Sequence, residues 1–419
     1  MVNRNPLKCD ACGTRIVTRT SIGHGDSQVH SFPCPTCGVG ITYKVILDQQ
    51  NSGIDYESGP ENATWVGSVD GSEPEVTFDS ELLLPNYALS TPALTPFIAA
   101  ASFLRDIPTF QRHEAVRLHW RKQIWPETSR LPVHFQNENW DLFDAEAKKI
   151  GQEPAEDSAA ARLDLLRHVY DLPFGWMLYP DSGRKSRVQQ RIALARAKEG
   201  ELVAQLAYDY LKSGRLAELW RQLQQFHQQF VRDFPYLSPV LQARIYWRDA
   251  EPDLTQCVVC DKRFPELKPL YIDAFETFAR LSVVAIGFEA IIFHGRLAIP
   301  TRRRSLDLAA FEKLPTANKP NHLKNYPIDD LFSPYLETSL RNGIGHNAAR
   351  YDAALDEVVC IQQDGGNLAE ERVHYTVFCH RVLEAASALF HSEPYFFALL
   401  EEIGGRLGAA PNKALQVIG

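Results

Sequence analysis

Two cysteine pairs near the start of the chain have the spacing of a metal site. The pairs are Cys9-Asp-Ala-Cys12 and Cys34-Pro-Thr-Cys37, with twenty-one residues between Cys12 and Cys34 and a glycine directly after each pair. This spacing is typical of zinc ribbons, with a slightly long intervening hairpin. Glycine lets the backbone turn so that amide groups can face the thiolates. Four thiolates leave no open position for water, so we predict a structural zinc ion held by these four cysteines.

A further pair, Cys257-Val-Val-Cys260, has the same internal spacing, but no second pair lies near it in the sequence. It is either part of a second zinc site completed by distant or partner-chain ligands, or half of a degenerate knuckle. A zinc hydrolase built on Cys257 and Cys260 lacks an activating carboxylate or histidine spaced with them. Cys360 and Cys379 lie in apolar patterns, and we predict them to be buried as small hydrophobic side chains.

The commoner catalytic signatures are absent from the sequence. It contains no HExxH, no GxxxxGK[ST] and no GxSxG, which argues against the usual metalloprotease, P-loop and hydrolase chemistries. The stretch Gly343 to Ala348 matches GxGxxA, but a helical pattern precedes it and no βαβ unit surrounds it, so we do not interpret it as a dinucleotide site.

The same stretch contains the sequence Arg341-Asn342-Gly-Ile-Gly-His346. RNA supplies its own nucleophile in the 2′-hydroxyl, so its cleavage needs only a base and a cation that holds the phosphate. His346 has a suitable ordinary pKa for the base, and Arg341 offers a permanently charged fork. The bare pattern R-x4-6-H occurs five times in the chain, but only at Arg341 does an asparagine follow the arginine. A surface arginine and a helix-start histidine without catalytic duty are the alternative.

The motif and the layout of residues 265–400 resemble the HEPN superfamily of small helical bundles, many of which are metal-independent ribonucleases. The resemblance covers one motif and the order of elements around it. It implies a homodimer in which two motifs meet, catalysis by Arg341 and His346, and a positioning role for Asn342. It also implies products with a 2′,3′-cyclic phosphate and a 5′-hydroxyl, no catalytic metal, and a role as a toxin or an antiviral-defence effector.

The elements that must position these residues can be predicted from periodicity. Residues 15–22 and 41–47 have β-type patterns, and residues 95–247 are helical, most clearly where apolar residues recur from Leu216 to Phe230. A long helix is predicted over residues 265–294, a second ending near Leu340, a strand and turn over 356–366, and a closing helix over 370–390.

These patterns predict a mainly α protein with a small β zinc ribbon at the N-terminus, a helical middle domain and a C-terminal HEPN-like helical bundle. The predicted domains are the zinc ribbon (1–48), a linker with short strands (49–90), the helical middle domain (91–250) and the HEPN-like domain (251–419).

Composition limits the partners and the compartment. The chain has 419 residues, 45% of them hydrophobic, and a formal net charge of -8, which argues against wholesale coating of nucleic acid. The most basic segment, residues 182–198, is either a solvated helix face or a contact with RNA or DNA. The longest apolar stretch, residues 281–293, is too short for a membrane span, and the first residues lack a secretory h-region, so we expect a cytoplasmic protein without membrane contact.

The leading hypothesis is therefore a dimeric HEPN-type endoribonuclease whose ribbon and middle region recognise RNA, a protein or a nucleic-acid trigger. The alternative is a non-enzymatic zinc-ribbon nucleic-acid-binding or scaffold protein that dimerises through its C-terminal helices.

Overall fold

The computed structural model describes residues 2–23, 25–48, 53–57, 59–68, 71–91, 94–101, 107–177, 182–246, 253–300, 305–315, 318–332, 338–345, 349–364, 367–405 and 410–415. It is 60% helical and carries several small sheets, which confirms the mainly α fold class.

The chain forms two compact units, each assembled from three segments that alternate along the sequence. Unit 1 contains Met1–Gln111, Arg232–Pro269 and Ser339–Leu383, and unit 2 contains Arg112–Val231, Leu270–Thr338 and Glu384–Gly419. The four consecutive domains suggested by the sequence stay a prediction.

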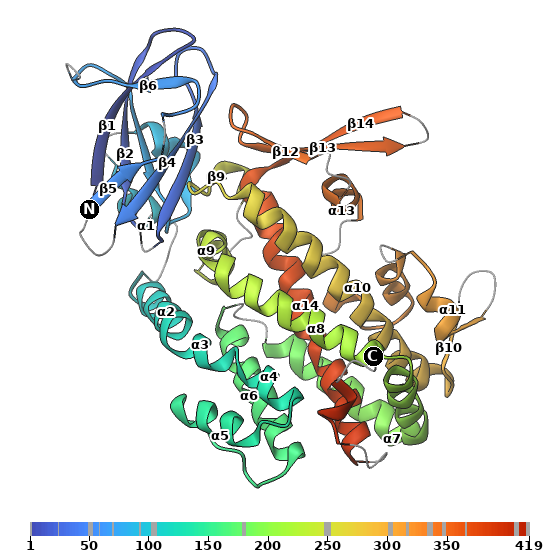
Figure 1. Ribbon diagram of the computed structural model, residues 1–419. Helices are drawn as coiled ribbons and strands as arrows, with labels where there is room; N and C mark the ends of the chain where they lie inside the picture. Colours follow the sequence, from blue (N-terminus) through green and yellow to red (C-terminus); the bar gives the residue numbers. More distant parts are fainter. Residues whose placement is uncertain are drawn as a thin grey trace. The chain divides into compact units, whose positions relative to one another are not determined.

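The N-terminal part of unit 1 is a β module of two sheets (Figure 1). One sheet has the order β6-β1-β2-β7 and the other the order β3-β4-β5. Only β2 and β7 are parallel neighbours in these sheets. Both sheets contribute to one core, in which the rings of Phe32 and Phe78 lie 5.4 Å apart. The strands are β1 (Val2–Cys9), β2 (Arg15–Ser21), β3 (Ser27–Pro33), β4 (Gly40–Asp48), β5 (Gly53–Tyr56), β6 (Ala63–Trp65) and β7 (Glu75–Asp79).

The stretch expected to be a linker, residues 49–90, contributes strands to both sheets. β5 pairs with β4, β6 pairs with β1, and β7 pairs with β2. Phe78 of β7 and Ala63 of β6 are buried in the shared core. The sequence pattern is weak here because these strands are only three to five residues long, so each shows little alternation.

The other two segments of unit 1 add the following elements. The second segment brings β9 (Cys257–Val258), which pairs with β8 (Leu84–Pro85) of the first segment. The third brings a three-stranded antiparallel sheet. Its strands are β12 (Ala349–Asp352), β13 (Glu357–Asp364) and β14 (Asn367–His374). The helical elements are η1 (Asn86–Ser90), α1 (Pro96–Ala101), η3 (Phe234–Tyr236), α9 (Ser238–Tyr246), η4 (Leu254–Gln256) and α13 (Thr338–Gly345).

Unit 2 is helical apart from one short two-stranded sheet. The sheet consists of β10 (Ala298–Pro300) and β11 (Ser305–Asp307). Two long helices, α10 (Phe264–His294) and α14 (Tyr375–Gly405), begin in unit 1 and continue into unit 2. The other helical elements are α2 (Ile107–His119), η2 (Trp120–Ile124), α3 (Trp125–Thr128), α4 (Leu131–Gln136), α5 (Trp140–Lys149), α6 (Ala159–Met177), α7 (Ser182–Lys212), α8 (Arg215–Asp233), α11 (Leu308–Glu312), η6 (Pro320–Asn325), α12 (Asp329–Phe332) and η8 (Lys413–Leu415).

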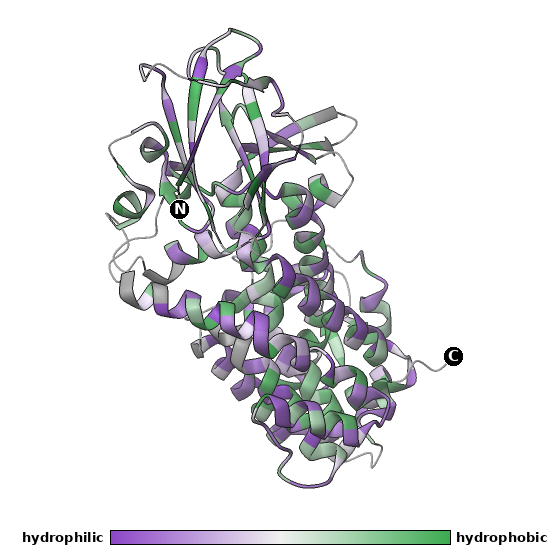
Figure 2. Ribbon diagram, turned by 60° about the vertical axis from the view of Figure 1, so that its left-hand side comes forward, coloured by the Kyte–Doolittle hydropathy of each residue, from purple (hydrophilic) through white to green (hydrophobic). Residues whose placement is uncertain are grey.

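The periodic apolar residues of α8 pack as their spacing predicts. Every one of the six is buried: Leu216, Leu219, Trp220, Leu223, Phe226 and Phe230. Trp220 stacks on Phe396 of α14 with ring centroids 5.8 Å apart, which places the apolar face of α8 against α14. Figure 2 shows hydrophilic and hydrophobic residues interleaved along the helices, as amphipathic packing requires.

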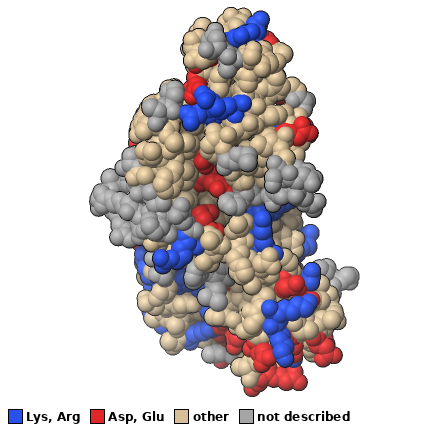
Figure 3. Space-filling model, turned by 90° about the vertical axis from the view of Figure 1, so that its left-hand side faces the viewer, with Lys and Arg blue, Asp and Glu red and all other residues tan. Residues whose placement is uncertain are grey.

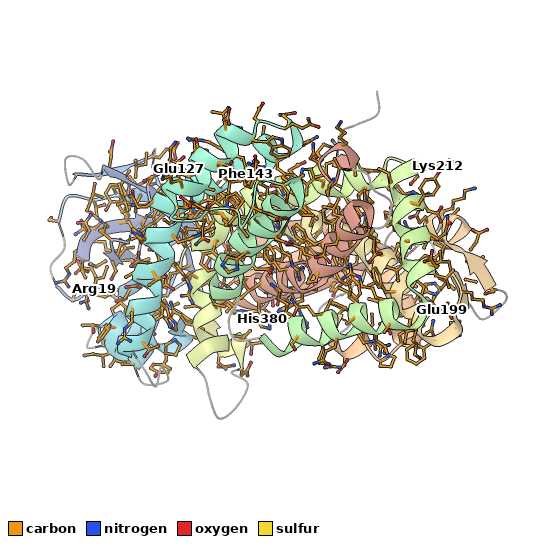
Figure 4. The ribbon with its side chains drawn as sticks, turned by 90° about the horizontal axis from the view of Figure 1, so that it is seen from below. Arg19, Glu127, Phe143, Glu199, Lys212 and His380 are labelled. Carbon is orange, nitrogen blue, oxygen red and sulfur yellow. The ribbon has the colours of Figure 1, made fainter. Side chains whose placement is uncertain are left out.

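The helix α7 changes direction at Glu199, whose backbone angles (φ -147°, ψ 63°) are not helical. Figure 4 shows the bend at Glu199 and the second half of the helix leading to Lys212.

The long helix predicted over residues 265–294 is α10, and its length and apolar composition would allow it to cross a bilayer. However, 83% of its most apolar window is buried inside the structure. A mostly buried core helix passes the same composition test, so the apolar stretch is explained by packing.

His30 of β3 lies in the core of the β module and is fully buried. Its Nδ1 lies 3.1 Å from the backbone oxygen of Cys260, and its ring centroid lies 5.0 Å from that of Phe78. Burial in these surroundings lowers the pKa of His30 from 6.5 to about 3. The imidazole is therefore neutral in the folded protein at pH 7.

This burial predicts acid sensitivity of unit 1. Because the folded pKa of His30 lies below its unfolded value, the unfolded chain takes up the extra proton, and stability falls as the pH drops below about 6.5. Between pH 7 and pH 5 the expected loss is about 2 kcal/mol. Denaturant unfolding at both pH values should show a smaller pH effect for His30→Gln than for the unmodified protein. An equal pH effect in both proteins would contradict the assignment, because the remaining groups titrate in both.

Candidate metal centre and candidate catalytic motif

The four N-terminal cysteines converge at one point of the β module. Their sulfur atoms all lie within 4.8 Å of one another. The Cys9 and Cys37 sulfurs are 3.8 Å apart, and those of Cys12 and Cys34 are 3.7 Å apart. With a metal–sulfur bond of about 2.3 Å, the edge of a regular tetrahedron of thiolates is about 3.8 Å. The cluster is therefore compatible with a structural metal site.

The two knuckles that carry these cysteines have the same backbone geometry. In the first, the Cys9 amide donates to Thr14 O (2.9 Å) and the Gly13 amide donates to Cys9 O (2.9 Å). In the second, the Cys34 amide donates to Val39 O (2.8 Å) and the Gly38 amide donates to Cys34 O (2.9 Å). Both glycines have φ near +75°, a conformation that side chains with a Cβ rarely adopt.

The closely spaced thiols of the site have pKa values shifted in opposite directions, and the pKa of Cys37 is raised to about 12 by burial and by hydrogen bonds to the other cysteine sulfurs. The Cys12 sulfur lies 3.1 Å from Thr14 Oγ1, and this hydrogen bond lowers the pKa of Cys12 to about 6. A thiolate is the form that coordinates a metal, so the lowered pKa favours binding near neutral pH.

The pair Cys257 and Cys260 occupies a different environment. Both side chains are buried, and burial raises their pKa values to about 11 and about 12. Cys260 and Val258 belong to the core of the β module. Within the described ranges, the N-terminal cluster is the one group of three or more potential ligands that converge, so a second zinc at Cys257 and Cys260 stays a prediction. Cys360 and Cys379 are buried, as predicted.

The candidate catalytic residues Arg341 and Asn342 lie on α13, a helix of eight residues. Leu340 and Ile344, four residues apart, are buried on one face of this helix, while Arg341 and Asn342 are half-buried. Arg341 Nη1 donates a hydrogen bond to Asn342 Oδ1 (3.1 Å). His346 lies outside the described residues, so its distance from Arg341 stays open.

The elements after the motif follow the predicted order, with different lengths. The strand and turn expected over residues 356–366 correspond to β13 and the start of a β13–β14 hairpin, and β12 adds a third strand. The closing helix expected over residues 370–390 is α14, which starts at Tyr375 and extends to Gly405. A helix was expected to end near Leu340, but α13 begins at Thr338 and ends at Gly345, so Arg341 and Asn342 lie within a helix rather than after one.

The basic segment of α7 is largely neutralised inside unit 2. Arg191 donates to Glu289 (2.8 Å), and Arg196 donates to Glu402 (2.7 Å). Ion pairs also join Lys185 to Asp171 and Arg187 to Asp330, and Lys198 donates to a backbone oxygen. Figure 3 draws the face on the side of α2 and α5, away from α7, and there too Lys and Arg lie in small separate groups, several beside Asp or Glu. The α7 segment therefore offers little uncompensated positive charge to a nucleic acid.

Sequence reasoning missed a cluster of buried charges in unit 1. It centres on Asp261, Lys262 and Arg263, here called the charged triplet, all of which are buried. Lys262 pairs with Asp356 of the third segment, and Asp261 pairs with Arg263. The available signal was three consecutive charges between Cys260 and a long apolar helix, but nothing in the sequence identified Asp356 as the partner.

Comparison of the chain with protein families, with curated proteins and with solved structures finds no match.

The cysteine cluster predicts a metal content that can be measured. The purified full-length protein should contain zinc, and Cys34→Ser should lose it, because three thiolates leave the shell open. The melting temperature of this variant should fall by about 10 °C, since each kcal/mol lost from the free energy of unfolding lowers the melting temperature by about 2–4 °C in a unit of this size. Elemental analysis and thermal denaturation are the measurements.

Cys257→Ser is the matched control, since it changes a buried cysteine outside the cluster. It should keep the same zinc content as the unmodified protein. Full zinc content in Cys34→Ser would refute the site, and loss of one zinc equivalent in Cys257→Ser would reveal a second one.

Proposed function

We propose that this protein is a dimeric, metal-independent endoribonuclease of the HEPN type, whose N-terminal cysteine cluster holds a structural zinc ion. The observation that supports it most directly is the hydrogen bond from Arg341 to Asn342 Oδ1 on α13. It holds a half-buried guanidinium in a fixed direction on the helix that leads to His346. A three-stranded sheet and the long helix α14 follow the motif in the chain.

The proposed reaction uses only the substrate and side chains. His346 removes the proton from a ribose 2′-hydroxyl, and the oxygen attacks the adjacent phosphorus. The bond from phosphorus to the 5′-oxygen breaks, and that oxygen takes up a proton from solvent. Arg341 binds the non-bridging phosphate oxygens, where charge accumulates in the transition state. The products carry a 2′,3′-cyclic phosphate and a 5′-hydroxyl.

Asn342 is proposed to orient Arg341, because its Oδ1 accepts a hydrogen bond of 3.1 Å from Arg341 Nη1. A planar guanidinium binds phosphate best in a fixed plane, so a neighbour that accepts one of its N–H groups reduces the freedom lost on binding. The proposed active form is a homodimer in which the motifs of the two chains meet at one RNA backbone.

The zinc ion is proposed to act outside the reaction. Four sulfur ligands suit zinc and fill its tetrahedral shell, so no position is left for water or a phosphate oxygen. The β module is therefore assigned to recognition of the RNA or of a protein or nucleic-acid trigger. All eight cysteines are free thiols in the structure, which fits the proposed location in the reducing cytoplasm and a role as toxin or antiviral-defence effector.

The second candidate is a non-enzymatic zinc-containing scaffold or nucleic-acid-binding protein. The closed cysteine shell favours it, since such a shell serves structure and binding rather than catalysis. It differs from the first candidate in one consequence: the motif residues would be dispensable for its function.

Cleavage of labelled single-stranded RNA tests the proposal. Arg341→Ala and His346→Ala should each lower the rate by at least about 100-fold, because each removes a group that acts in the transition state. Asn342→Ala should have a smaller effect. Excess chelator added just before the assay should not stop cleavage. Analysis of the product ends should find the cyclic phosphate, and expression of the unmodified protein should slow growth.

Arg221→Ala is the matched control, because Arg221 and His227 form another R-x5-H pattern and Arg221 is exposed on α8. It should cleave RNA at the normal rate. Full activity in both Arg341→Ala and His346→Ala would end the ribonuclease proposal and favour the scaffold.

A further inference from the structure

Asp356 ends the turn between β12 and β13, in the chain that leaves the motif helix (Figure 1). Its φ of +54° is in the left-handed region, which an aspartate tolerates better than most residues but which needs support from its surroundings. Its backbone oxygen accepts a hydrogen bond from the Tyr375 amide (2.8 Å) at the start of α14. Asp356 therefore fixes the junction of β12, β13 and α14.

The Asp356 carboxylate has two close donors. Lys262 Nζ donates to Oδ1 (2.6 Å), and Tyr351 Oη donates to the same oxygen (2.8 Å). Tyr351 belongs to β12, so the Asp356 carboxylate connects this strand to Lys262. His374 Nε2 lies 3.8 Å from the second oxygen.

Lys262 is an unusual partner because its side chain is only 2% exposed. A buried ammonium group needs a counter-charge, and loss of one member of such a pair typically costs several kcal/mol. The ammonium also lies 4.7 Å from the centre of the Tyr375 ring, a cation–π contact that holds it at the start of α14. The position of Lys262 is thus defined on several sides.

The residues around Lys262 attach it to the β module. The Lys262 amide donates to Val29 O (2.7 Å), and the Val29 amide donates to Asp261 Oδ1 (2.8 Å). The charged triplet is therefore hydrogen-bonded to β3, an edge strand of its sheet. Arg263 Nη2 donates to Ser27 O (2.6 Å). Lys262 therefore extends from a rigid edge of the β module toward the turn at Asp356.

A second contact joins the same two regions. A Cβ placed on Gly40, at the start of β4, would lie 2.8 Å from Ala353 Cβ in the β12–β13 turn. Gly40 follows the second cysteine knuckle by two residues. The turn after β12 is therefore packed against the β module by close approach as well as by charge.

We infer that Lys262 and Asp356 are positioning residues for the motif: their ion pair anchors β12, the first described element after α13. The inference rests on the proposed ribonuclease function for its catalytic consequence. β12 begins four residues after Gly345, the last residue of α13. His346 lies three residues before this anchored strand in the sequence, and a shift of about 1 Å in a catalytic group can lower a rate about 100-fold.

Asp356→Asn and Tyr351→Phe in the full-length protein test this inference. Asp356→Asn should speed amide hydrogen exchange in α13 and β12 by about tenfold or more, because the anchor of the turn is lost. It should lower kcat for RNA cleavage by a similar factor with KM unchanged. Tyr351→Phe removes one hydrogen bond and should lower kcat a few-fold without loss of fold. Lys262→Arg should retain most of the activity that Lys262→Met loses.

Glu357→Gln is the matched control, since Glu357 is the neighbouring residue and pairs with Arg372 on the surface. It should leave exchange and kcat unchanged. Normal exchange in α13 and β12 of Asp356→Asn overturns the inference, whether or not the protein cleaves RNA. Increased exchange with normal kcat also overturns it. If Asp356→Asn fails to fold, an unchanged kcat in Tyr351→Phe overturns the inference. Failure of the ribonuclease proposal shows separately, as absence of cleavage by the unmodified protein.

Discussion

The arrangement of unit 1 depends on how it accommodates buried charge. Lys262 cannot be placed away from water without a carboxylate, because desolvation of an unpaired ammonium costs more than any single packing contact returns. Asp356 supplies this carboxylate from a segment almost one hundred residues later in the chain. The positions of β9, the β12–β14 sheet and the start of α14 follow from that pairing together with the hydrogen bonds to β3.

The cysteine cluster and the motif belong to the same compact unit, although more than three hundred residues separate Cys37 from Arg341. With the proposed zinc bound, four thiolates leave no open coordination position, so the cluster is proposed to act on the motif mechanically: it holds the knuckle that precedes Gly40, and Gly40 lies close to the β12–β13 turn. Under the proposed function, recognition by the β module and chemistry at the motif are linked through this turn and through the charged triplet.

Local patterns in the sequence predicted local features well. The knuckle glycines, the packed face of α8, and the long apolar helix from residue 264 to 294 all follow from spacing within one segment. Short strands were expected within residues 49–90, but their pairing with β1 and β2, like the Lys262–Asp356 pair, depends on partners far along the chain, for which spacing carries no signal. The cations of α7 illustrate the same limit, because their run suggested an exposed face while acids from other helices neutralise most of them. The candidate catalytic motif was proposed from its residue types, and the structure adds the contact between Arg341 and Asn342.

The interleaving of the two units has a consequence for biosynthesis. The β module of unit 1 is synthesised before the segment Ser339–Leu383, which unit 1 needs for its completion. At about 5–20 residues per second, the β module waits some tens of seconds for the segment that neutralises Lys262. The cysteine shell can close earlier, since its ligands lie within the first forty residues. If the proposed zinc binds there, a nascent or truncated chain can thus hold it while Lys262 still lacks Asp356, and under the inference above its motif remains unanchored until Asp356 has been added.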